Sequence, residues 1–314
     1  MSKTKPMYYV YHIPNIKVGM TKDLGDRVFE QQGYEPDEVE LLFVSRDLES
    51  ASIKEIEYQK FYGYTVDRQS YKELMNKQKP KIMNEFKING SREASYTPIV
   101  AGGKRACVLH YIDNNQNIKD GELVLVDAGC EYGMYASDIT RTYPINGKFT
   151  GEQRAIYDVV LEAHNAACHA AKVGNPCTDP QKTSEKSLSQ GLKDIGLLKG
   201  SLDEILEKNL YREFYYHKIG HWMGLDVHDD CPYSIDGKEI LFEDDMVMTI
   251  EPGIYVNDTA DVDERWKGIG VRIENDILVK SDGYENLTVK VPVQADEIEQ
   301  LMSCLLYTSP SPRD

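Results

Sequence analysis

The chain has 314 residues, of which 41% are hydrophobic, so it could hold one large or two modest domains with a substantial core. Its net charge of −16 argues against nucleic acid as the partner of the whole chain, and no apolar run approaches the ~20 residues of a membrane span. No signal-like segment follows the N-terminus, so we expect a cytoplasmic protein. The six cysteines form no C-x-x-C pair, which favours reduced thiols.

The charge is unevenly distributed along the chain. Residues 1–90 contain 14 basic and 14 acidic side chains, so the later residues supply the entire −16. This asymmetry predicts a boundary near Gly90, with a small domain over 1–90 and a larger domain over 91–303. Bound cations would neutralise part of the excess acid in the larger domain.

The first 75 residues have the pattern of a small α/β domain. Residues 8–13 and 16–20 predict a hairpin, 24–32 a helix, 41–44 a third strand and 52–61 a second helix. A small domain with tyrosine-rich strands is the simplest interpretation.

The same stretch resembles a GIY-YIG nuclease module. The resemblance rests on the Tyr-Val-Tyr strand, on the Lys-Val-Gly-Met-Thr run that begins at Lys17, on Arg27 and on an acid at Glu55 or Glu57. Lys17 stands where the second motif usually has tyrosine, so the resemblance to the fold is closer than the resemblance to the active site. Nucleic acid is expected as a partner only through residues 1–90.

In the larger domain, two carboxylates flank a predicted hairpin. Residues 108–111 and 123–127 read as strands, and the second ends in Asp127. A symmetric hairpin turning between Tyr132 and Gly133 would place Asp127 opposite Asp138, with Cβ atoms ~4.5–5.5 Å apart. Two such carboxylates need a shared proton or a cation, unless Arg141 pairs with one of them.

Three helices follow this hairpin. A capping box at residues 150–153 opens a helix that runs to about Lys172, a second helix covers 180–194, and Ser201 caps a third that ends near Asn209. His164 and His169 lie on the first helix without acidic partners at ligand spacing. We therefore interpret both histidines as structural.

Residues 216–229 contain three of the seven histidines, at His217, His221 and His228. Histidine is the commonest neutral metal ligand and the usual proton carrier near neutral pH. The spacing of a helical zinc motif is not matched, because Lys218 replaces the required glutamate and two glycines interrupt the helix. The stretch is predicted to be a glycine-rich loop.

Two later predicted strands carry an acid where burial normally demands an apolar residue. These strands are residues 245–253, with Glu251, and residues 268–279, with Glu274. Alternation in the second strand places Arg272 and Glu274 on one face. A buried carboxylate is costly unless it is paired or bound to metal.

Four carboxylates and one imidazole can therefore form one site, and they are Asp127, Asp138, His221, Glu251 and Glu274. Four negative charges balance two divalent cations, and mostly oxygen ligands with one nitrogen suit manganese, with cobalt or zinc as substitutes. Two metals ~3.5–4 Å apart can share a hydroxide and polarise a carbonyl, as amide hydrolysis requires.

Residues 94–302 closely resemble the Xaa-Pro aminopeptidases of the pita-bread metallopeptidase family, which also includes prolidase, methionine aminopeptidase and creatinase. The resemblance is carried by residues 109–111, 126–132, 137–142, 220–229, 251–253 and 270–274. It implies an α+β pita-bread catalytic domain. It also implies release of an N-terminal residue from peptides whose second residue is proline, with two divalent ions, most simply Mn²⁺, as cofactors.

The resemblance also implies a role for each site residue. Asp127 would bind one metal, Asp138 and Glu274 would bridge both, and His221 and Glu251 would complete the second, with Glu251 also the base for the bridging water. His110, His217 and His228 would hold substrate and stabilise the tetrahedral intermediate. Arg272 and Tyr255 would support the site on the substrate side.

The pattern differs from the family at both ends. The first helices of the catalytic domain have no counterpart in residues 1–90, which predicts a truncated domain with an uncovered apolar face and leaves its activity open. Residues 304–314 match one reading frame of a sequencing adapter, so we expect a non-native tail and a chimeric join near Gly90. A prolidase-type dipeptidase, a GIY-YIG DNA-processing protein with a vestigial peptidase domain, a non-catalytic binding protein and a homo-oligomer stay open as alternatives.

Overall fold

A computed structural model describes residues 7–14, 17–21, 36, 39–46, 48–61 and 86–307. The chain divides into two compact units, Met1–Glu85 and Phe86–Asp314, so the division lies close to the predicted boundary at Gly90. None of the helices in these described ranges is both long and apolar enough to cross a membrane.

The first unit contains an antiparallel sheet with the order β2-β1-β3. Its strands are β1 (Tyr8–Ile13), β2 (Lys17–Thr21) and β3 (Glu40–Ser45), and α1 (Leu48–Phe61) follows. The predicted hairpin, third strand and second helix are therefore confirmed. Glu55 is buried on α1 and Glu57 is exposed, whereas Arg27 and the predicted helix at 24–32 lie outside the described residues. The GIY-YIG resemblance stays a prediction.

The second unit begins with an antiparallel sheet in the order β5-β6-β8, formed by β5 (Ile99–Gly102), β6 (Leu123–Asp127) and β8 (Thr140–Pro144). A short pair, β4 (Glu93–Ala94) with β7 (Cys130–Glu131), extends the β6–β8 hairpin. The predicted strand at 123–127 is confirmed.

The predicted strand at residues 108–111 is wrong. The chain forms a 3-10 helix, η3 (Gly103–Cys107), and then turns. The Val108 N–H donates to the carbonyl of Arg105, and the Ile112 N–H donates to the carbonyl of His110. These local bonds occupy backbone groups that a strand would direct to a neighbour, so the apolar run does not pair.

The three predicted helices are confirmed as α3 (Gly151–Ala170), α4 (Asp179–Asp194) and α5 (Leu202–Glu207). The predicted capping box at Thr150 and the Ser201 cap are both present. A 3-10 helix, η4 (Leu210–Glu213), follows, and α6 (Ala295–Tyr307) comes last. The non-native origin of residues 304–314 stays a prediction, and residues 308–314 lie outside the described part.

The second half of the unit contains two further sheets. They are β11-β14-β15, from β11 (Val247–Ile250), β14 (Asn275–Lys280) and β15 (Gly283–Asn286), and β12-β13, from β12 (Gly253–Val256) and β13 (Ile269–Arg272). A small exposed hairpin, β9 (Ser234–Ile235) with β10 (Lys238–Glu239), and a 3-10 helix, η5 (Glu264–Trp266), lie in the connections. The two long strands predicted at 245–253 and 268–279 are therefore each interrupted.

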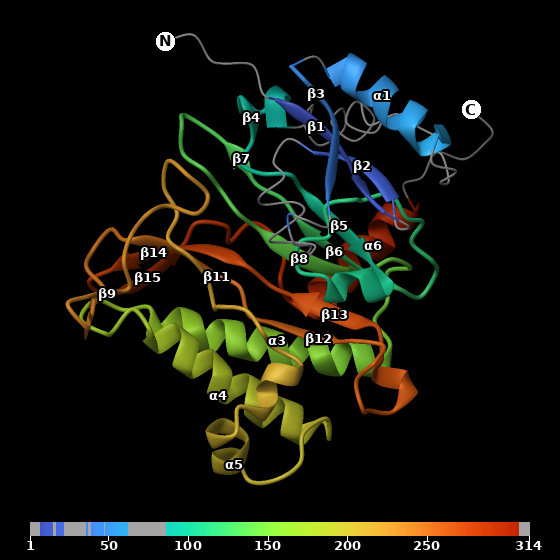
Figure 1. The fold of residues 1–314 in the computed structure, drawn as a ribbon. Coiled ribbons are helices and arrows are strands. Elements are labelled where there is room, and N and C mark those ends of the chain that lie inside the picture. The colour runs from blue at the N-terminus through green and yellow to red at the C-terminus, as the bar shows by residue number, and fades with distance from the viewer. Residues whose placement is uncertain are drawn as a thin grey trace. The chain divides into compact units, whose positions relative to one another are not determined.

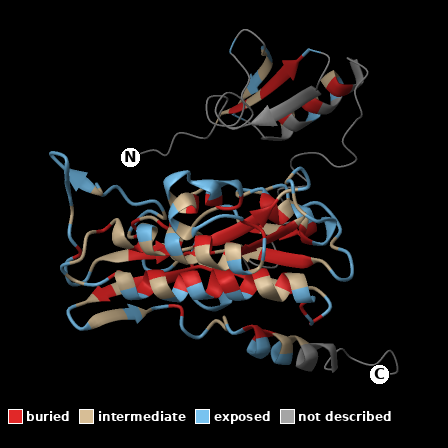
Figure 2. Ribbon diagram, turned by 90° about the horizontal axis from the view of Figure 1, so that it is seen from below, coloured by how far each residue is buried: buried red, intermediate tan, exposed pale blue. Residues whose placement is uncertain are grey.

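Helices α3 and α4 pack side by side, and α3 contacts β11, β12 and β13 of this unit (Figure 1). The main core joins Ile156, Tyr157 and Val160 of α3 to Ile254 of β12 and Val271 of β13. Buried residues gather on the strands and on the helix sides that face them, and exposed residues lie mainly on the connecting loops (Figure 2). The helices thus cover one side of the strands, and the candidate site forms on the polar faces of those strands.

Candidate metal centre

Asp127 and Asp138 lie on the β6–β8 hairpin, but their predicted register is wrong. The hairpin turns at residues 133–134, both of which have positive φ (57° and 77°). A two-residue turn of this kind centres the hairpin one residue later than predicted, so Asp127 pairs with Thr140 rather than with Asp138. Asp138 is consequently in a diagonal position on the same face.

The two aspartates nevertheless meet at one side chain. The Tyr96 hydroxyl lies within hydrogen-bond distance of Oδ1 of both Asp127 and Asp138. Arg141 does not pair with either carboxylate, because its guanidinium donates to the main-chain carbonyls of Thr140, Glu274, Val291 and Pro292 and to the side chain of Asn275. The predicted alternative to a cation, a salt bridge from Arg141 to Asp127 or Asp138, is therefore absent among the described contacts.

Glu251 and Glu274 lie in the two strand interruptions. Ile250 pairs with Asn275 on one side of the break, and Gly253 pairs with Arg272 on the other. The same register places Glu251 opposite Glu274. The acids are therefore not ordinary strand residues, because the ladder stops where their side chains turn inward, and both are largely buried.

His221 lies in an extended segment, residues 219–223, that runs beside β11. The Thr249 N–H donates to the His221 carbonyl (2.9 Å), and the His221 N–H donates to the Thr249 hydroxyl (3.0 Å). Gly220 permits this approach, since a Cβ there would lie 1.9 Å from the Thr249 carbonyl oxygen. The predicted glycine-rich loop is thus an extra extended chain against the sheet.

The five predicted donors come together at this point of the fold. Ligand atoms of Asp138, His221 and Glu274 all lie within 4.8 Å of one another. His221 Nε2 is 3.4 Å from Asp138 Oδ2 and 3.7 Å from Glu251 Oε1. Asp127 joins the group through the shared tyrosine hydroxyl.

The carboxylates carry more negative charge than their neighbours offset. Burial raises the pKa of Glu274 well above its ordinary value and that of Glu251 to about 7. Burial also raises the pKa of Asp127, against the opposing effect of Arg272. Arg272 donates to Asp127 Oδ2 (2.6 Å), whereas the described bonds of the other three carboxylates come from hydroxyl and imidazole groups. Such a set fits divalent cations.

Asp138 and His221 shift each other's pKa. Burial acts to raise the pKa of Asp138, but hydrogen bonds from His221 and Tyr96 lower it. Burial acts to lower the pKa of His221, but Asp138 and then Glu251 raise it. A positive charge at this position is therefore stabilised by the site, whether it is a proton on the imidazole or a bound cation.

His217, Tyr255 and Arg272 form a second connected group. The Tyr255 hydroxyl is 2.8 Å from His217 Nε2 and accepts from Arg272 Nη1 (3.2 Å). Burial, assisted by the charge of Arg272, lowers the pKa of His217 to about 4. A neutral His217 accepts from the tyrosine at Nε2 and donates from Nδ1 to the Lys218 carbonyl (2.7 Å).

His228 and His110 are close to these groups. The His228 ring packs edge-on against His221, with centroids 4.3 Å apart. Burial, and then the charge of His221, lowers the pKa of His228. His110 is exposed in the turn after η3, and its charge acts on both His217 and His228. All ten residues singled out in the sequence are therefore placed near one centre.

Three further residues belong to the site and were not identified from the sequence. Tyr96 contacts both aspartates, and the Thr140 hydroxyl donates to Glu274 Oε2 (2.6 Å). Asp276 Oδ2 accepts from the backbone N–H of Asp138 (3.3 Å), while its buried Oδ1 has no partner. Asp276 could have been noticed as another acid in an apolar strand, but Tyr96 lies in a loop without a local signal.

The family model of metallopeptidase family M24 matches residues 63–281, so the match begins before the predicted start near Ala94. Xaa-Pro aminopeptidase from Haemophilus influenzae is 49% identical over 222 residues, which are 71% of this chain and 51% of that protein. The Escherichia coli Xaa-Pro aminopeptidase is 46% identical over 222 residues, which are 71% of this chain and 50% of that protein. The chain thus spans about half the length of these curated relatives.

Solved structures agree with the sequence matches. Aminopeptidase PepP of Pseudomonas aeruginosa superposes with a TM-score of 0.72 at 44% identity and covers 74% of this chain and 53% of its own. Escherichia coli aminopeptidase P with the inhibitor Pro-Leu superposes with a TM-score of 0.70 at 44% identity, and the match covers 72% of this chain and 52% of that one. The predicted pita-bread fold is confirmed, and the chain belongs to metallopeptidase family M24.

Proposed function

We propose that the chain is a metal-dependent aminopeptidase that hydrolyses the Xaa-Pro bond at the N-terminus of peptides. The observation that carries this proposal is the convergence of four buried carboxylates and one imidazole with a single guanidinium among their described partners. The names of the relatives support proline specificity, and one related structure holds the inhibitor Pro-Leu.

The five donors would hold two divalent ions. Asp138 and Glu274 would bridge both ions, Asp127 would complete one, and His221 with Glu251 would complete the other. When bound, the two metal ions would supply a nucleophilic hydroxide at neutral pH and polarise the scissile carbonyl. The mixture of oxygen donors and one nitrogen favours Mn²⁺ as the physiological metal.

The remaining residues act on the substrate and on protons. Glu251 has its pKa raised to about 7 by burial, so its carboxylate can accept a proton near neutral pH. His217 and Tyr255 form a fixed pair whose hydroxyl is oriented by Arg272, which suits binding of a peptide carbonyl. His110 and His228 would hold the other side of the substrate and stabilise the tetrahedral intermediate.

Finer features of the proposal rest on the same relatives. They favour an aminopeptidase over a prolidase-type dipeptidase and over a DNA-processing role. We propose a peptide with proline at its second position as the partner and the cytoplasm as the location. Assembly into a homo-oligomer stays a prediction.

Hydrolysis of an Xaa-Pro-containing peptide with added Mn²⁺ tests the function. We expect release of the N-terminal residue and its loss in Asp138→Ala, because that change removes a bridging donor. The matched control is Asp158→Ala, which removes an exposed acid of α3. Release that persists unchanged in Asp138→Ala would refute the two-metal site.

A further inference from the structure

The backbone of Ile219 is hydrogen-bonded on both sides. Its carbonyl accepts from the Glu251 N–H (2.7 Å), and its own N–H donates to Gln181 Oε1 of α4 (2.6 Å). Ile219 is buried and lies two residues from both His217 and His221. One side chain of α4 therefore holds the point at which the histidine segment (residues 216–229) meets the backbone of Glu251.

The Gln181 amide has a defined orientation. Its Nε2 donates to Glu185 Oε1 (2.9 Å), one helical turn later, so its oxygen is directed to Ile219. Helix α4 is itself closely packed on α3, where a Cβ at Gly191 would lie 2.4 Å from Val159. The hydrogen bond to Ile219 thus comes from a rigid support.

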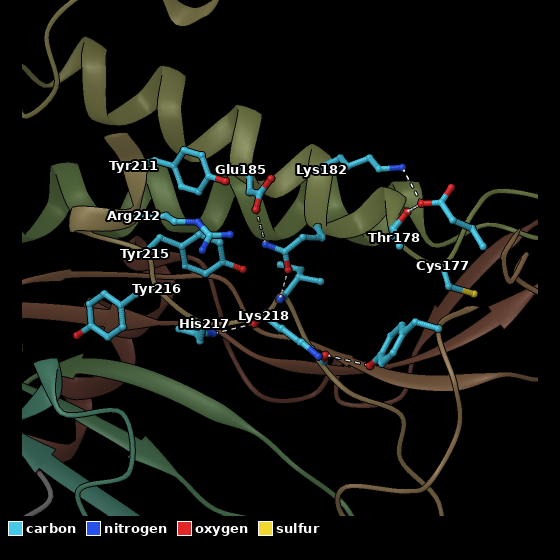
Figure 3. Close-up of a pocket in the computed structure, with 15 residues that line it drawn as sticks. Cys177, Thr178, Lys182, Glu185, Tyr211, Arg212, Tyr215, Tyr216, His217 and Lys218 are labelled. Atoms are coloured by element: carbon cyan, nitrogen blue, oxygen red, sulfur yellow. Dashed lines mark hydrogen bonds and ion pairs between the residues drawn. The ribbon is translucent and has the colours of Figure 1, made fainter. Parts of the chain in front are cut away.

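A cavity of about 570 Å³ lies beside this bond, between α4 and the histidine segment (Figure 3). Its lining includes Gln181, Glu185, Tyr215 and Lys218. A cavity of this size can admit water to the Ile219 N–H when the side chain at position 181 no longer accepts from it. A change at Gln181 would then mainly shift the histidine segment, and the chain would still fold.

We propose that Gln181 is a positioning residue for the metal centre, acting through the Ile219 backbone on His221 and Glu251. This inference rests on the proposed function, in which both side chains bind metal. Partners that orient metal ligands typically contribute 10–100-fold to metal affinity or activity. Gln181 itself touches neither the donors nor the substrate-side residues in the described contacts.

The test measures Mn²⁺ affinity by calorimetry and the visible spectrum of the Co²⁺-loaded protein. Gln181→Met removes the acceptor at nearly constant volume, and we expect it to weaken Mn²⁺ binding ~10-fold and to alter the Co²⁺ spectrum. The control Lys182→Met changes the next, exposed side chain of α4 and should leave both unchanged. Equal affinity and spectra in Gln181→Met and the wild type would overturn the proposal.

A double variant tests the hydrogen bonds rather than the fold. In Gln181→Glu with Glu185→Gln, position 181 offers a carboxylate oxygen to Ile219, and position 185 donates an amide back to it. We expect recovery of Mn²⁺ affinity to near the wild-type value, and no recovery would overturn the positioning role.

Amide exchange measured without metal separates the two proposals. Gln181→Met should accelerate exchange at the Ile219 N–H, and unchanged exchange counts against the positioning role. If the wild-type protein binds no metal, or binds metal and cleaves no Xaa-Pro peptide, the proposed function is refuted. The exchange comparison at the Ile219 N–H then still decides whether Gln181 holds this backbone in place.

Discussion

Glu251 and Glu274 lie opposite each other in a gap between two antiparallel strand pairs, β11–β14 and β12–β13. Directly opposed residues of antiparallel strands point to the same face, so this register directs both acids to the same side. Continuous pairing would keep them on one face as well, but the ladder ends on either side of them, so β11–β14 and β12–β13 form separate sheets. The register between the two strands, which the sequence pattern did not predict, is thus what brings these acids together in the site.

The raised pKa of Glu251 predicts how pH affects the metal-free protein. Its folded pKa of about 7 exceeds the ordinary 4.5, so the folded state binds the proton more tightly and stability falls as pH rises through this window. Glu251→Gln cannot ionise. We expect this variant to gain stability relative to the wild type between pH 4.5 and about 7, by at most ~1.4 kcal/mol per pH unit, and the difference to level off above that range.

Urea unfolding in the presence of a chelator measures this difference at each pH. The comparison with Glu251→Gln cancels the titration of other groups, such as His164, whose pKa is lowered to about 4 by burial. A constant difference across the range would show that Glu251 titrates alike in the folded and unfolded states.

Arg272 is predicted to stabilise the metal-free site. It donates to Asp127, Tyr255 and Thr140 from a fully buried position. Arg272→Met leaves a buried acid without its guanidinium, and we expect a loss of about 3 kcal/mol in chelator, with a smaller loss when metal is bound. Unfolding by urea with and without Mn²⁺ checks this result.

Arg265→Met is the matched control for that experiment, because Arg265 is exposed and its ion pairs are 3.8 Å long. It should change stability by less than about 1 kcal/mol. Equal losses in the two variants, or a larger loss for Arg272→Met with metal than without, would contradict the assigned role.

Much of the site was predictable because its residues carry local signals. Glu251 and Glu274 stand out as acids in apolar runs, and the histidines at 217–228 stand out against their glycines. The helices were predictable for the same reason, since the Thr150 capping box and the apolar periodicity that follows it are local. Local patterns thus identify the donors and the elements that carry them.

The parts that were not predictable depend on pairing across the fold. The Asp127 register depended on residues 133–134, and a methionine with positive φ gives no turn signal. Residues 108–111 have an apolar pattern typical of a strand but fold back on η3. Tyr96 reaches both aspartates from a distant loop, and no spacing rule connects it to them.

Gly220 is predicted to be essential for the position of His221. A Cβ there would lie 1.9 Å from the Thr249 carbonyl oxygen, so Gly220→Ala must push the histidine segment away from β11. We expect Mn²⁺ affinity to fall at least ~10-fold, because the imidazole would move from the carboxylates. Calorimetric titration with Mn²⁺ measures the change.

Gly151→Ala provides the comparison, since a Cβ there meets nothing within 4 Å and lies at the first position of α3. This variant should bind metal as the wild type does and should be slightly more stable, because alanine favours the helix. Unimpaired metal binding in Gly220→Ala would mean that His221 does not depend on this close approach.

The pair His217 and Tyr255 makes a prediction about protonation. The tyrosine hydroxyl accepts from Arg272 and so directs its own proton to His217 Nε2, while Nδ1 donates to the Lys218 carbonyl. With its pKa lowered to about 4 by burial, His217 should remain neutral from pH 5.5 to 8. NMR titration of the metal-free protein should show no His217 transition in this range.

The Tyr255→Phe variant then tests what the hydroxyl contributes. It leaves Nε2 of His217 without its donor and Nη1 of Arg272 without its acceptor, so we expect Xaa-Pro hydrolysis to fall ~10-fold while Mn²⁺ affinity stays near the wild-type value. Tyr143→Phe is the control, because the described contacts give its hydroxyl no hydrogen bond and it lies in β8 at the helix-covered core. A His217 transition near pH 6.5 would contradict the assigned neutral state. A loss of Mn²⁺ binding in Tyr255→Phe equal to the loss of hydrolysis would show that this pair serves the metal donors rather than the substrate.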